Sequence, residues 1–223
     1  MTSARKEISS RVRVRRGPKK GRYDRASIDD VLDRGLVAHV AFADGDGAVC
    51  IPMLYARVGD TVYIHGSTAS RAMRLLAAGA PACLTVTLVH ALVLARSTFE
   101  HSANYDSVLV FGAFSLVEDE AERLSAFEAF TEKLLPGRWD EARRPYAKEL
   151  KATSILGLEI DEASAKMRSG GPDDDDSEDA ALDVWAGVVP IVSSYGTPTA
   201  SSGLREGIPV PESVKRLLRA PPG

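Results

Sequence analysis

The sequence has few cysteines and no long apolar run. Its 223 residues contain two cysteines, Cys50 and Cys83, both in apolar surroundings and without metal-ligand spacing. Two such cysteines do not form a disulfide framework, so we expect reduced thiols. No stretch reaches the roughly 18 apolar residues that a membrane span needs, and the basic N-terminus lacks the apolar segment of a secretory signal. A cytoplasmic protein without membrane association is therefore expected.

Several catalytic signatures are also missing. The chain has no P-loop, no HExxH motif, no Ser-His-Asp spacing and no paired Cys/His cluster. Hydrolytic and zinc chemistry therefore have little support, and no metal site is expected.

Charge is nearly balanced, with a formal net charge of −3, but it is unevenly distributed. Residues 1–25 carry ten Lys and Arg against two acidic side chains, and residues 173–179 form an acidic block. The block does not fit an EF-hand loop, so we interpret it as solvated. The basic segment has Tyr23 as its one aromatic residue and the rest of the chain is acidic. Nucleic-acid binding is therefore disfavoured, and we interpret the segment as a strap over the protein or a partner.

Short apolar runs separated by Gly and Asp turns dominate the middle of the chain, and they predict antiparallel strands. Pro52 lies inside one such run, which indicates an edge or a bulge because proline cannot donate to a ladder. The expected elements are a helix over residues 28–34, strands over 36–43, 48–57 and 61–65, a helix over 69–78, strands over 82–89, 91–95 and 107–117, a helix over 118–135 and a strand over 154–160.

This order of elements is typical of the mainly β, α+β class, and six or seven strands that are apolar throughout favour a small barrel. Ser27 with Asp30 resembles a capping box for the first helix, and Ser67 or Thr68 is expected to cap the second. We expect three parts: a basic N-terminal arm over residues 1–22, one domain over 23–195 with an acidic loop at 170–182, and a C-terminal tail over 196–223.

The most informative segment for function runs from residue 61 to residue 74, where a strand leads through a polar loop into a helix. Free N–H groups and the dipole at a helix start favour an anion. Arg71 and Arg74 are neighbours on one helix face, so together with Ser70 they can bind a phosphate through charge-assisted bonds. The alternative is an ordinary amphipathic helix with solvated arginines.

Two further residues have both a structural and a functional interpretation. His65 ends the strand before this loop; it is either a structural histidine or, beside a redox cofactor, a group that titrates or hydrogen-bonds the cofactor ring. Trp185 lies in an apolar run; it is either a core residue or, near Lys166 and Arg168, one wall of a site for a planar ligand. The pattern alone leaves both alternatives open.

A series of short blocks runs through residues 15–195 in a specific order, although no single block is decisive. The blocks are RGP at 16–18, GRYDR at 21–25, IPMLY at 51–55, YIHG at 63–66, SR at 70–71, ARS at 95–97, HSANYDS at 101–107, FG at 111–112, AKMR at 165–168 and WAGVVP at 185–190. The series resembles the pyridoxamine 5'-phosphate oxidase-like superfamily of FMN-binding split barrels, and most closely its flavin-nucleotide-binding branch, which includes the nitroimidazole-resistance proteins.

The resemblance implies a six- to seven-stranded antiparallel split β-barrel with flanking helices, and FMN bound at the interface of a homodimer. The residues that it implies for the flavin ring and ribityl chain are Pro52, Met53, Leu54, Tyr55, Ile64, His65 and Gly66. For the phosphate it implies Ser70, Arg71 and Arg74. Lys166, Arg168 and Trp185 would approach from the partner chain, near the substrate.

Two positions depart from the pattern of the family. Asp106 stands where similar sequences often have arginine, so the local charge is inverted. Ala72 stands where the oxidase itself carries a second basic phosphate ligand, and Arg74 is the residue expected to substitute. The substrate-binding arginine and histidine pattern of the oxidase is not evident, so oxidation of pyridoxamine phosphate itself is not expected.

The expected function is that of an FMN-dependent oxidoreductase acting on a small organic molecule. The flavin performs the electron or hydride transfer in such proteins, and the protein supplies orientation and a nearby cation. The resemblance gives catalytic roles to three residues: Lys166 or Arg168 as the cation and His65 as a proton relay. The alternative is a flavin-binding or storage protein without turnover, and related barrels also hold deazaflavin or haem.

Overall fold

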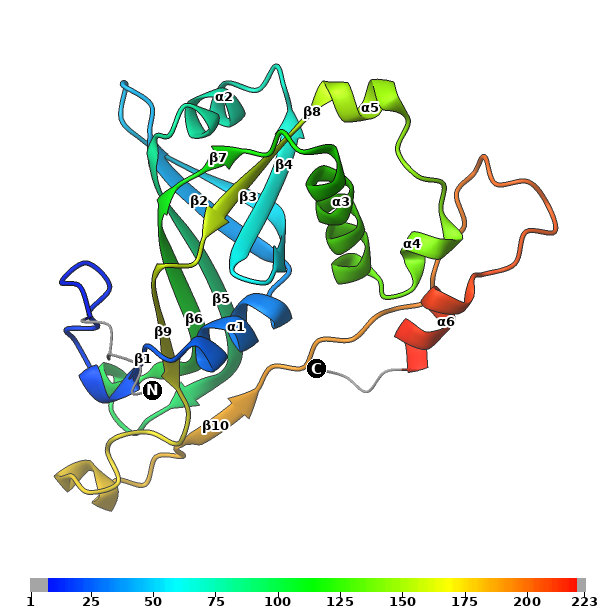
Figure 1. Ribbon diagram of the computed structural model, residues 1–223. Coiled ribbons are helices and arrows are strands. Elements are labelled where there is room, and N and C mark those ends of the chain that lie inside the picture. The colour runs from blue at the N-terminus through cyan, green and yellow to red at the C-terminus, as the bar shows by residue number, and fades with distance from the viewer. Residues whose placement is uncertain (1–7, 220–223) are drawn as a thin grey trace, which may run out of the picture.

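The computed structural model describes residues 8–219, so residues 1–7 of the expected arm and 220–223 of the expected tail lie outside the described residues. The described residues form a ten-stranded antiparallel sheet with helices around it (Figure 1). The strands are β1 (Gly21–Arg22), β2 (Val37–Ala43), β3 (Ala48–Val58), β4 (Thr61–Ser67), β5 (Pro81–Leu94), β6 (Ser102–Ala113), β7 (Ser115–Leu116), β8 (Thr153–Glu159), β9 (Glu162–Arg168) and β10 (Gly187–Pro190).

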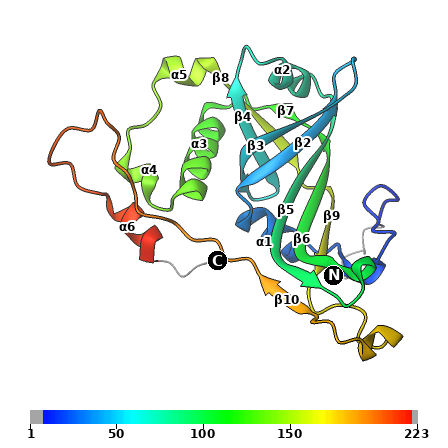
Figure 2. The ribbon, with the colours of Figure 1, turned by 180° about the vertical axis from the view of Figure 1, so that it is seen from behind.

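Six α-helices and three 3-10 turns accompany these strands within the described residues. The helices are α1 (Arg25–Arg34), α2 (Arg71–Ala77), α3 (Glu120–Leu134), α4 (Arg138–Glu141), α5 (Ala147–Ala152) and α6 (Glu212–Arg219), and the 3-10 turns are η1 (Pro18–Lys20), η2 (Thr98–Glu100) and η3 (Glu178–Ala181). Helix α3 packs on the half of the sheet that contains β4 and β8, whereas α1 packs against β5, β6 and β9 (Figures 1 and 2).

Strand β3 changes its neighbour halfway along its length, and this change divides the sheet. Residues 48–54 pair with β2, whereas residues 55–58 pair with β4. From β2 the sheet continues through β5, β6 and β9, and from β4 it continues through β8 and β7. We call the place where β3 changes its neighbour the split. Among the described residues, Pro52 pairs with β2 and its other side is unpaired. This is the edge position that was predicted for a proline.

The main core fills the space between the two parts of the sheet. Alternate side chains of β2, β5 and β6 face inward, and Val40, Leu84 and Val110 are all 0% exposed. Burying one such side chain contributes roughly 1.5–3 kcal/mol, so the alternation fixes the strand register. A second cluster, which includes Phe130 and Ile155, joins α3 to the other face of β4 and β8.

The fold class is confirmed, but both expected helix caps are wrong. Helix α1 is capped by Asp24, whose carboxylate accepts a hydrogen bond from the Ser27 amide at 2.9 Å. Helix α2 begins at Arg71 and is capped by Ser70. The Ser67 hydroxyl instead accepts from the Ala69 amide at 3.2 Å, within the turn that precedes the helix.

The strand list differs from the expected one in several places: β1 was not expected, and residues 107–117, expected as one strand, are divided between β6 and β7. Residues 81–94 form one strand, where two were expected, because a bulge between Val89 and Ala91 absorbs the irregular residue. Strands β9 and β10 were not expected, and both pair with strands more than fifty residues earlier in the chain.

The loop between β9 and β10 is attached to the barrel, which differs from the solvated loop that was expected. Asp174 is only 1% exposed. Its carboxylate accepts from the Arg96 amide at 2.6 Å and from the Arg96 guanidinium at 3.0 Å. The tail then returns to the helical side of the molecule, where Ser213 of α6 hydrogen-bonds the Glu141 carboxylate of α4.

Candidate cofactor site at the split of the sheet

The edge of β3 that β4 leaves unpaired is the first part of the candidate site. Pro52 and Leu54 are exposed on the outward face, whereas Met53 packs on the core. Tyr55 is 1% exposed, and its hydroxyl donates to the Leu32 backbone oxygen at 2.6 Å. Of these four residues, only Pro52 and Leu54 can present side chains to a ligand, and the other two can offer only backbone groups.

The end of β4 lies across the split from this edge. Ile64 is 0% exposed and belongs to the core, so it too can offer only its backbone. A Cβ atom at Gly66 would lie 2.8 Å from Cγ of Met73. The glycine therefore lets α2 pack directly on β4, and this packing brings the start of α2 to the split.

His65 lies on the opposite face of β4 from Ile64 and Gly66. Its ring centre is 4.5 Å from that of Phe130 and 6.1 Å from that of Phe127, both on α3. Its Nδ1 atom is buried without a hydrogen-bond partner, and burial lowers the pKa of the imidazole below its usual value. His65 is therefore neutral at pH 7 and is directed toward α3, away from the phosphate-binding residues expected on α2.

The two arginines of α2 have different surroundings. The Arg71 guanidinium lies 3.1 Å from the carboxylate of Asp44 and 3.1 Å from that of Asp46, both in the turn between β2 and β3. Its side chain is 59% exposed. Arg74 is exposed, and the Ser70 hydroxyl caps the helix. A phosphate at this position would compete with two carboxylates for Arg71.

The two basic residues of β9 are also unlike each other. Arg168 is 6% exposed; its guanidinium donates to Asn104 Oδ1 at 2.6 Å and to the Gly171 backbone oxygen at 3.2 Å. This bonding fixes the loop after β9, so a catalytic role for Arg168 would require these bonds to break. Lys166 lies beside Ser107 in the register and forms no ion pair within residues 8–219.

Strand β9 and the residues before β10 lie away from the edge of β3 in a single protomer. Three strands separate β9 from β3 in the sheet, so the path along the sheet from Lys166 to that edge is about 19 Å at the usual strand spacing. Trp185 is 65% exposed and packs against Gly187, at the far end of β5. The structure thus brings together β3, the end of β4 and the start of α2, but not His65, Lys166, Arg168 or Trp185.

The sequence did not reveal the ion-pair partners of two charged residues, Arg71 and Asp106. The aspartates that bind Arg71 were interpreted only as turn residues. Asp106 was expected to invert the local charge, but it receives the Arg34 guanidinium at 2.7 Å and lies 2.8 Å from His90 Nε2. Although burial alone would raise the pKa of Asp106, the hydrogen bonds from Arg34 and His90 lower it. The negative charge is therefore locally compensated.

Two features are absent from the described part of the chain. No group of three or more His, Cys, Asp or Glu side chains in residues 8–219 is arranged to bind a metal ion. None of the helices in that range combines the length and the apolar character that crossing a bilayer requires.

An open antiparallel barrel that divides at one strand, with a helix start beside the division, defines the split-barrel class. The family model described as pyridoxamine 5'-phosphate oxidase matches residues 24–167, and the chain belongs to this family. This match confirms the family that the sequence resembles. A search of curated proteins gives no match to the chain.

Solved structures give closer comparisons. The chain is 37% identical to the flavocytochrome Anf3 from Azotobacter vinelandii, covering 94% of this chain and 97% of that one, with a TM-score of 0.88. It is 42% identical to the FAD and haem binding protein from Mycobacterium smegmatis, covering 89% and 97%, with a TM-score of 0.84. A putative 5-nitroimidazole antibiotic resistance protein from Bacteroides thetaiotaomicron shares the fold at 18% identity, covering 66% and 85%, with a TM-score of 0.54.

Proposed function

We propose that this protein is a redox protein that binds a flavin and a haem and works as a homodimer. One observation carries the proposal: the likeness over nearly the whole chain to a flavocytochrome and to an FAD and haem binding protein. The family match ends at residue 167, so this likeness extends to segments beyond the barrel that the family match does not cover. Flavin and haem supply electron-transfer chemistry, and the protein supplies binding and orientation.

The residues at the split suit a flavin nucleotide. The unpaired edge of β3 can offer backbone groups to the ring, and Arg71 and Arg74 can bind phosphate. FMN is what the resemblance implied. We propose FAD instead, because the M. smegmatis protein, at 42% identity, is described as binding FAD.

A homodimer is supported by the apolar side chains around β10. Val188 is 37% and Val189 is 43% exposed. Consecutive residues of a strand face opposite ways, so both faces of β10 are exposed. Trp185 and Val192 are both 65% exposed. Contiguous exposed apolar surface of this kind marks an interaction site. We propose that a second copy covers it and that Lys166 and Trp185 thereby approach the β3 edge of the partner.

Among the four histidines, His65 best suits a haem iron. His90 is bonded to Asp106, and His101 Nδ1 accepts from the Ala95 amide at 3.1 Å. His65 has a buried Nδ1 without a partner and lies against two phenylalanine rings, and its lowered pKa favours the neutral imidazole that ligates metals. We therefore propose that His65 would hold the haem iron, in place of the proton relay that was expected.

A second candidate function is that of a flavin-dependent oxidoreductase acting on a small organic molecule, without haem. The match to the pyridoxamine 5'-phosphate oxidase family favours it. In this case Lys166, delivered by the partner chain, would be the cation beside the flavin ring. Reduction of the bound flavin followed by its reoxidation on an added substrate would distinguish an enzyme from a storage protein.

The deciding experiment is an absorbance spectrum of protein expressed with a haem precursor, followed by release of the chromophores and their identification by mass. The proposal expects both a flavin and a haem Soret band, with FAD released. Flavin without haem would favour the second candidate, and a protein that binds neither would overturn both. His65→Ala is expected to lose haem and keep flavin, whereas the control His39→Ala, on the outward face of β2, is expected to keep both.

A further inference from the structure

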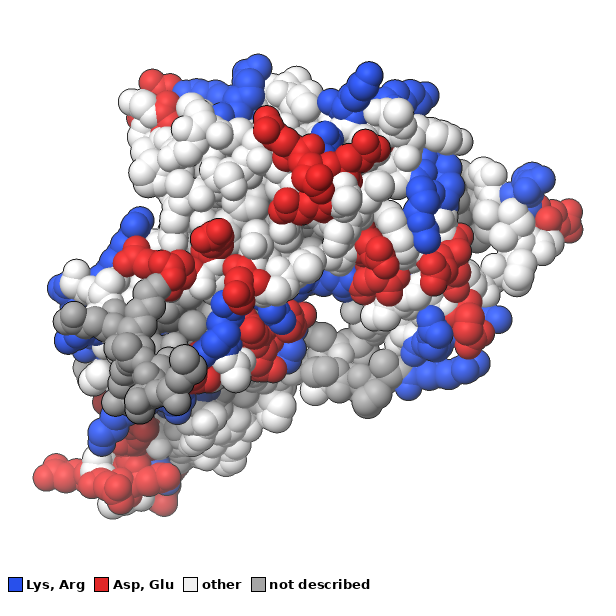
Figure 3. Space-filling model, viewed as in Figure 1, with Lys and Arg blue, Asp and Glu red and all other residues white. Residues whose placement is uncertain are grey.

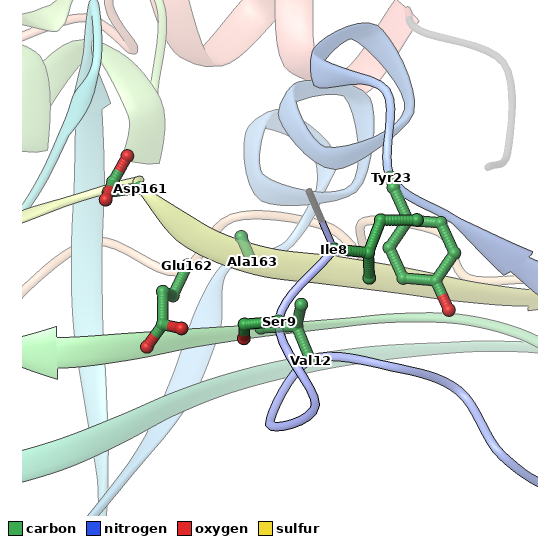
Figure 4. Close-up of a pocket in the computed structure, with 7 residues that line it drawn as sticks. All are labelled: Ile8, Ser9, Val12, Tyr23, Asp161, Glu162 and Ala163. Atoms are coloured by element: carbon green, nitrogen blue, oxygen red, sulfur yellow. The ribbon is translucent and has the colours of Figure 1, made fainter. Parts of the chain in front are cut away.

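The described part of the N-terminal arm is fixed against the barrel. Val12 is 8% exposed, and the Val14 amide donates to the Tyr23 hydroxyl at 2.8 Å. Figure 4 shows Ile8, Ser9 and Val12 of the arm facing Tyr23 and the start of β9 around a cavity of about 120 Å³. The arm is therefore an ordered surface element.

A tight turn continues this fixed path. Gly17 has a φ of 65°, a left-handed conformation that glycine adopts without strain. The Lys20 amide then closes the turn onto the Gly17 oxygen at 2.9 Å. Directly afterwards β1 pairs with β9, with Gly21 opposite Lys166. The backbone of residues 12–22 is thus held at both ends and in the middle.

Most cations of the described arm form no ion pair with a carboxylate of residues 8–219. Arg11 is the exception, because it lies 3.7 Å from Glu162 and stacks over the Phe111 ring. Arg13 and Arg22 donate only to backbone oxygens, which leaves their charge intact. The residues of the arm without an ion pair in the described part of the chain are Arg13, Arg15, Arg16, Lys19, Lys20 and Arg22, and Lys166 adjoins them. We call the six arm residues the basic platform; Lys166, which the proposed homodimer turns toward the partner, is not part of it.

Folding does not require the basic platform, and the repulsion between its like charges raises the free energy of the native protein. Like charges held close together repel, and the chain as a whole is slightly acidic, with a net charge of −3. Figure 3 shows Lys and Arg at the side of the molecule where the arm lies, whereas the acidic loop projects below it. A fixed group of uncompensated cations on an acidic protein suits a negatively charged partner.

We propose that the basic platform docks an acidic electron-carrier protein. A protein suits this surface better than a nucleic acid does. The one aromatic residue of the region, Tyr23, has its hydroxyl bonded to the arm and is half-buried, so it is not free to stack on a base.

That the partner is an electron carrier is inferred from the proposed redox function. Lys166 lies opposite Gly21 in the register, so a carrier docked on the platform would lie beside the residue that the proposed homodimer turns toward the flavin. Each docking would oxidise a one-electron carrier and pass its electron to the flavin. Two dockings, with protons from water, complete the reduction. Opposite charges would steer the carrier to the platform and make its association sensitive to salt.

The test uses the cofactor-loaded protein and a plant-type [2Fe–2S] ferredoxin as the acidic probe, with binding measured by calorimetry at about 0.02 M and about 0.5 M salt. The wild type is expected to bind at low salt and to lose most of its affinity at high salt. Arg16→Glu/Lys19→Glu should weaken binding at least about tenfold. The control Lys148→Glu/Lys151→Glu makes the same change in net charge on α5 and should change binding by less than about twofold.

Three results would contradict docking of an acidic carrier on the basic platform. These are no binding by the wild type at low salt, equal losses in the two double variants, or tighter binding of a short DNA duplex with the same dependence on Arg16 and Lys19. The same titration is repeated with the protein as purified, and its flavin content is measured separately. A protein that binds the ferredoxin at the platform yet holds no flavin would therefore support the docking surface and contradict the proposed function.

Discussion

Lys133 and Tyr55 donate to the same acceptor, the backbone oxygen of Leu32 near the end of α1. The Lys133 ammonium and the Tyr55 hydroxyl each lie 2.6 Å from that oxygen, and the ammonium is 4.2 Å from the centre of the tyrosine ring. One carbonyl thereby joins α1, β3 and α3. Burial lowers the pKa of Lys133 to about 8 from its ordinary 10.5.

The first prediction concerns the pH dependence of stability. Between pH 8 and 10.5 the unfolded chain binds more protons at Lys133 than the native protein does, so this residue makes native stability rise with pH across that window. In Lys133→Met this contribution is missing. The difference in unfolding free energy, wild type minus variant, should therefore increase by about 1 kcal/mol, a value reduced for partial exposure.

Urea unfolding at several pH values across the window measures this difference. Tyr55 ionises in the unfolded state of both proteins, so its effect cancels. A difference that stays constant with pH would show that Lys133 has the same pKa in the native and unfolded states.

Gly66 gives the second prediction, because α2 packs directly on it. Gly66→Ala would place a Cβ atom 2.8 Å from Cγ and 3.0 Å from Sδ of Met73, which is 2% exposed. The substitution should cost about 1–3 kcal/mol of unfolding free energy, as overpacking does. In a Met73→Ala background the cost should fall toward zero, because the clashing atoms are gone.

Gly196→Ala is the matched control, since nothing lies within 4 Å of a Cβ atom there. It should change stability by less than about 0.5 kcal/mol. Equal effects at the two glycines, measured by chemical unfolding, would mean that packing of α2 on β4 does not limit residue 66.

The sequence suffices for those parts of the fold that depend on neighbouring residues. Strands β2, β3 and β4 follow one another through Gly and Asp turns, so alternation and turn chemistry predict all three. Strand β9 could not be predicted in the same way. Its segment mixes small, charged and apolar residues, and it is a strand because β6, about fifty residues earlier, pairs with it.

In the candidate site, too, the sequence predicts what depends on neighbouring residues but not what depends on distant ones. Period-two alternation along residues 61–67 already places His65 on the opposite face from Ile64 and Gly66, although the sequence does not show that α3 covers that face. The ion pairs of Arg71 were not available from the sequence either, because its partners lie 25 and 27 residues earlier. No local pattern distinguishes an arginine that is solvated from one that a distant turn binds.

The third prediction concerns the loop after β9. Asp174→Ala removes the acceptor of both the Arg96 amide and the Arg96 guanidinium. Asp174 is 1% exposed, whereas the Arg96 side chain is 20% exposed and keeps its ion pair with Asp175, so we expect the two lost hydrogen bonds to cost about 2 kcal/mol of stability. The loop should also become open to a glutamate-specific protease at Glu178.

Asp176→Ala in the same loop is the control, because Asp176 is exposed. It should leave both thermal unfolding and the rate of cleavage at Glu178 nearly unchanged. If Asp174→Ala behaves like this control, the contact with Arg96 does not hold the loop.

The fourth prediction follows from the competition for Arg71 between phosphate and the turn of Asp44 and Asp46. Asp44→Asn/Asp46→Asn removes two negative charges and keeps the side-chain oxygen that accepts from the Asp46 amide at 3.0 Å. Freed from these carboxylates, Arg71 should bind flavin phosphate more readily. Titration of the flavin-free protein, followed by quenching of flavin fluorescence, should show affinity raised about threefold to tenfold at low salt.

Arg71→Ala tests whether that gain acts through the arginine. Alone it should weaken flavin binding by about tenfold, since one charge-assisted contact is lost. Combined with the two asparagine substitutions it should cancel their benefit, because coupled residues are not additive. If instead the gain persists without Arg71, the aspartates act through their general negative charge, and the gain should then decline with salt as steeply as the repulsion between exposed charges does.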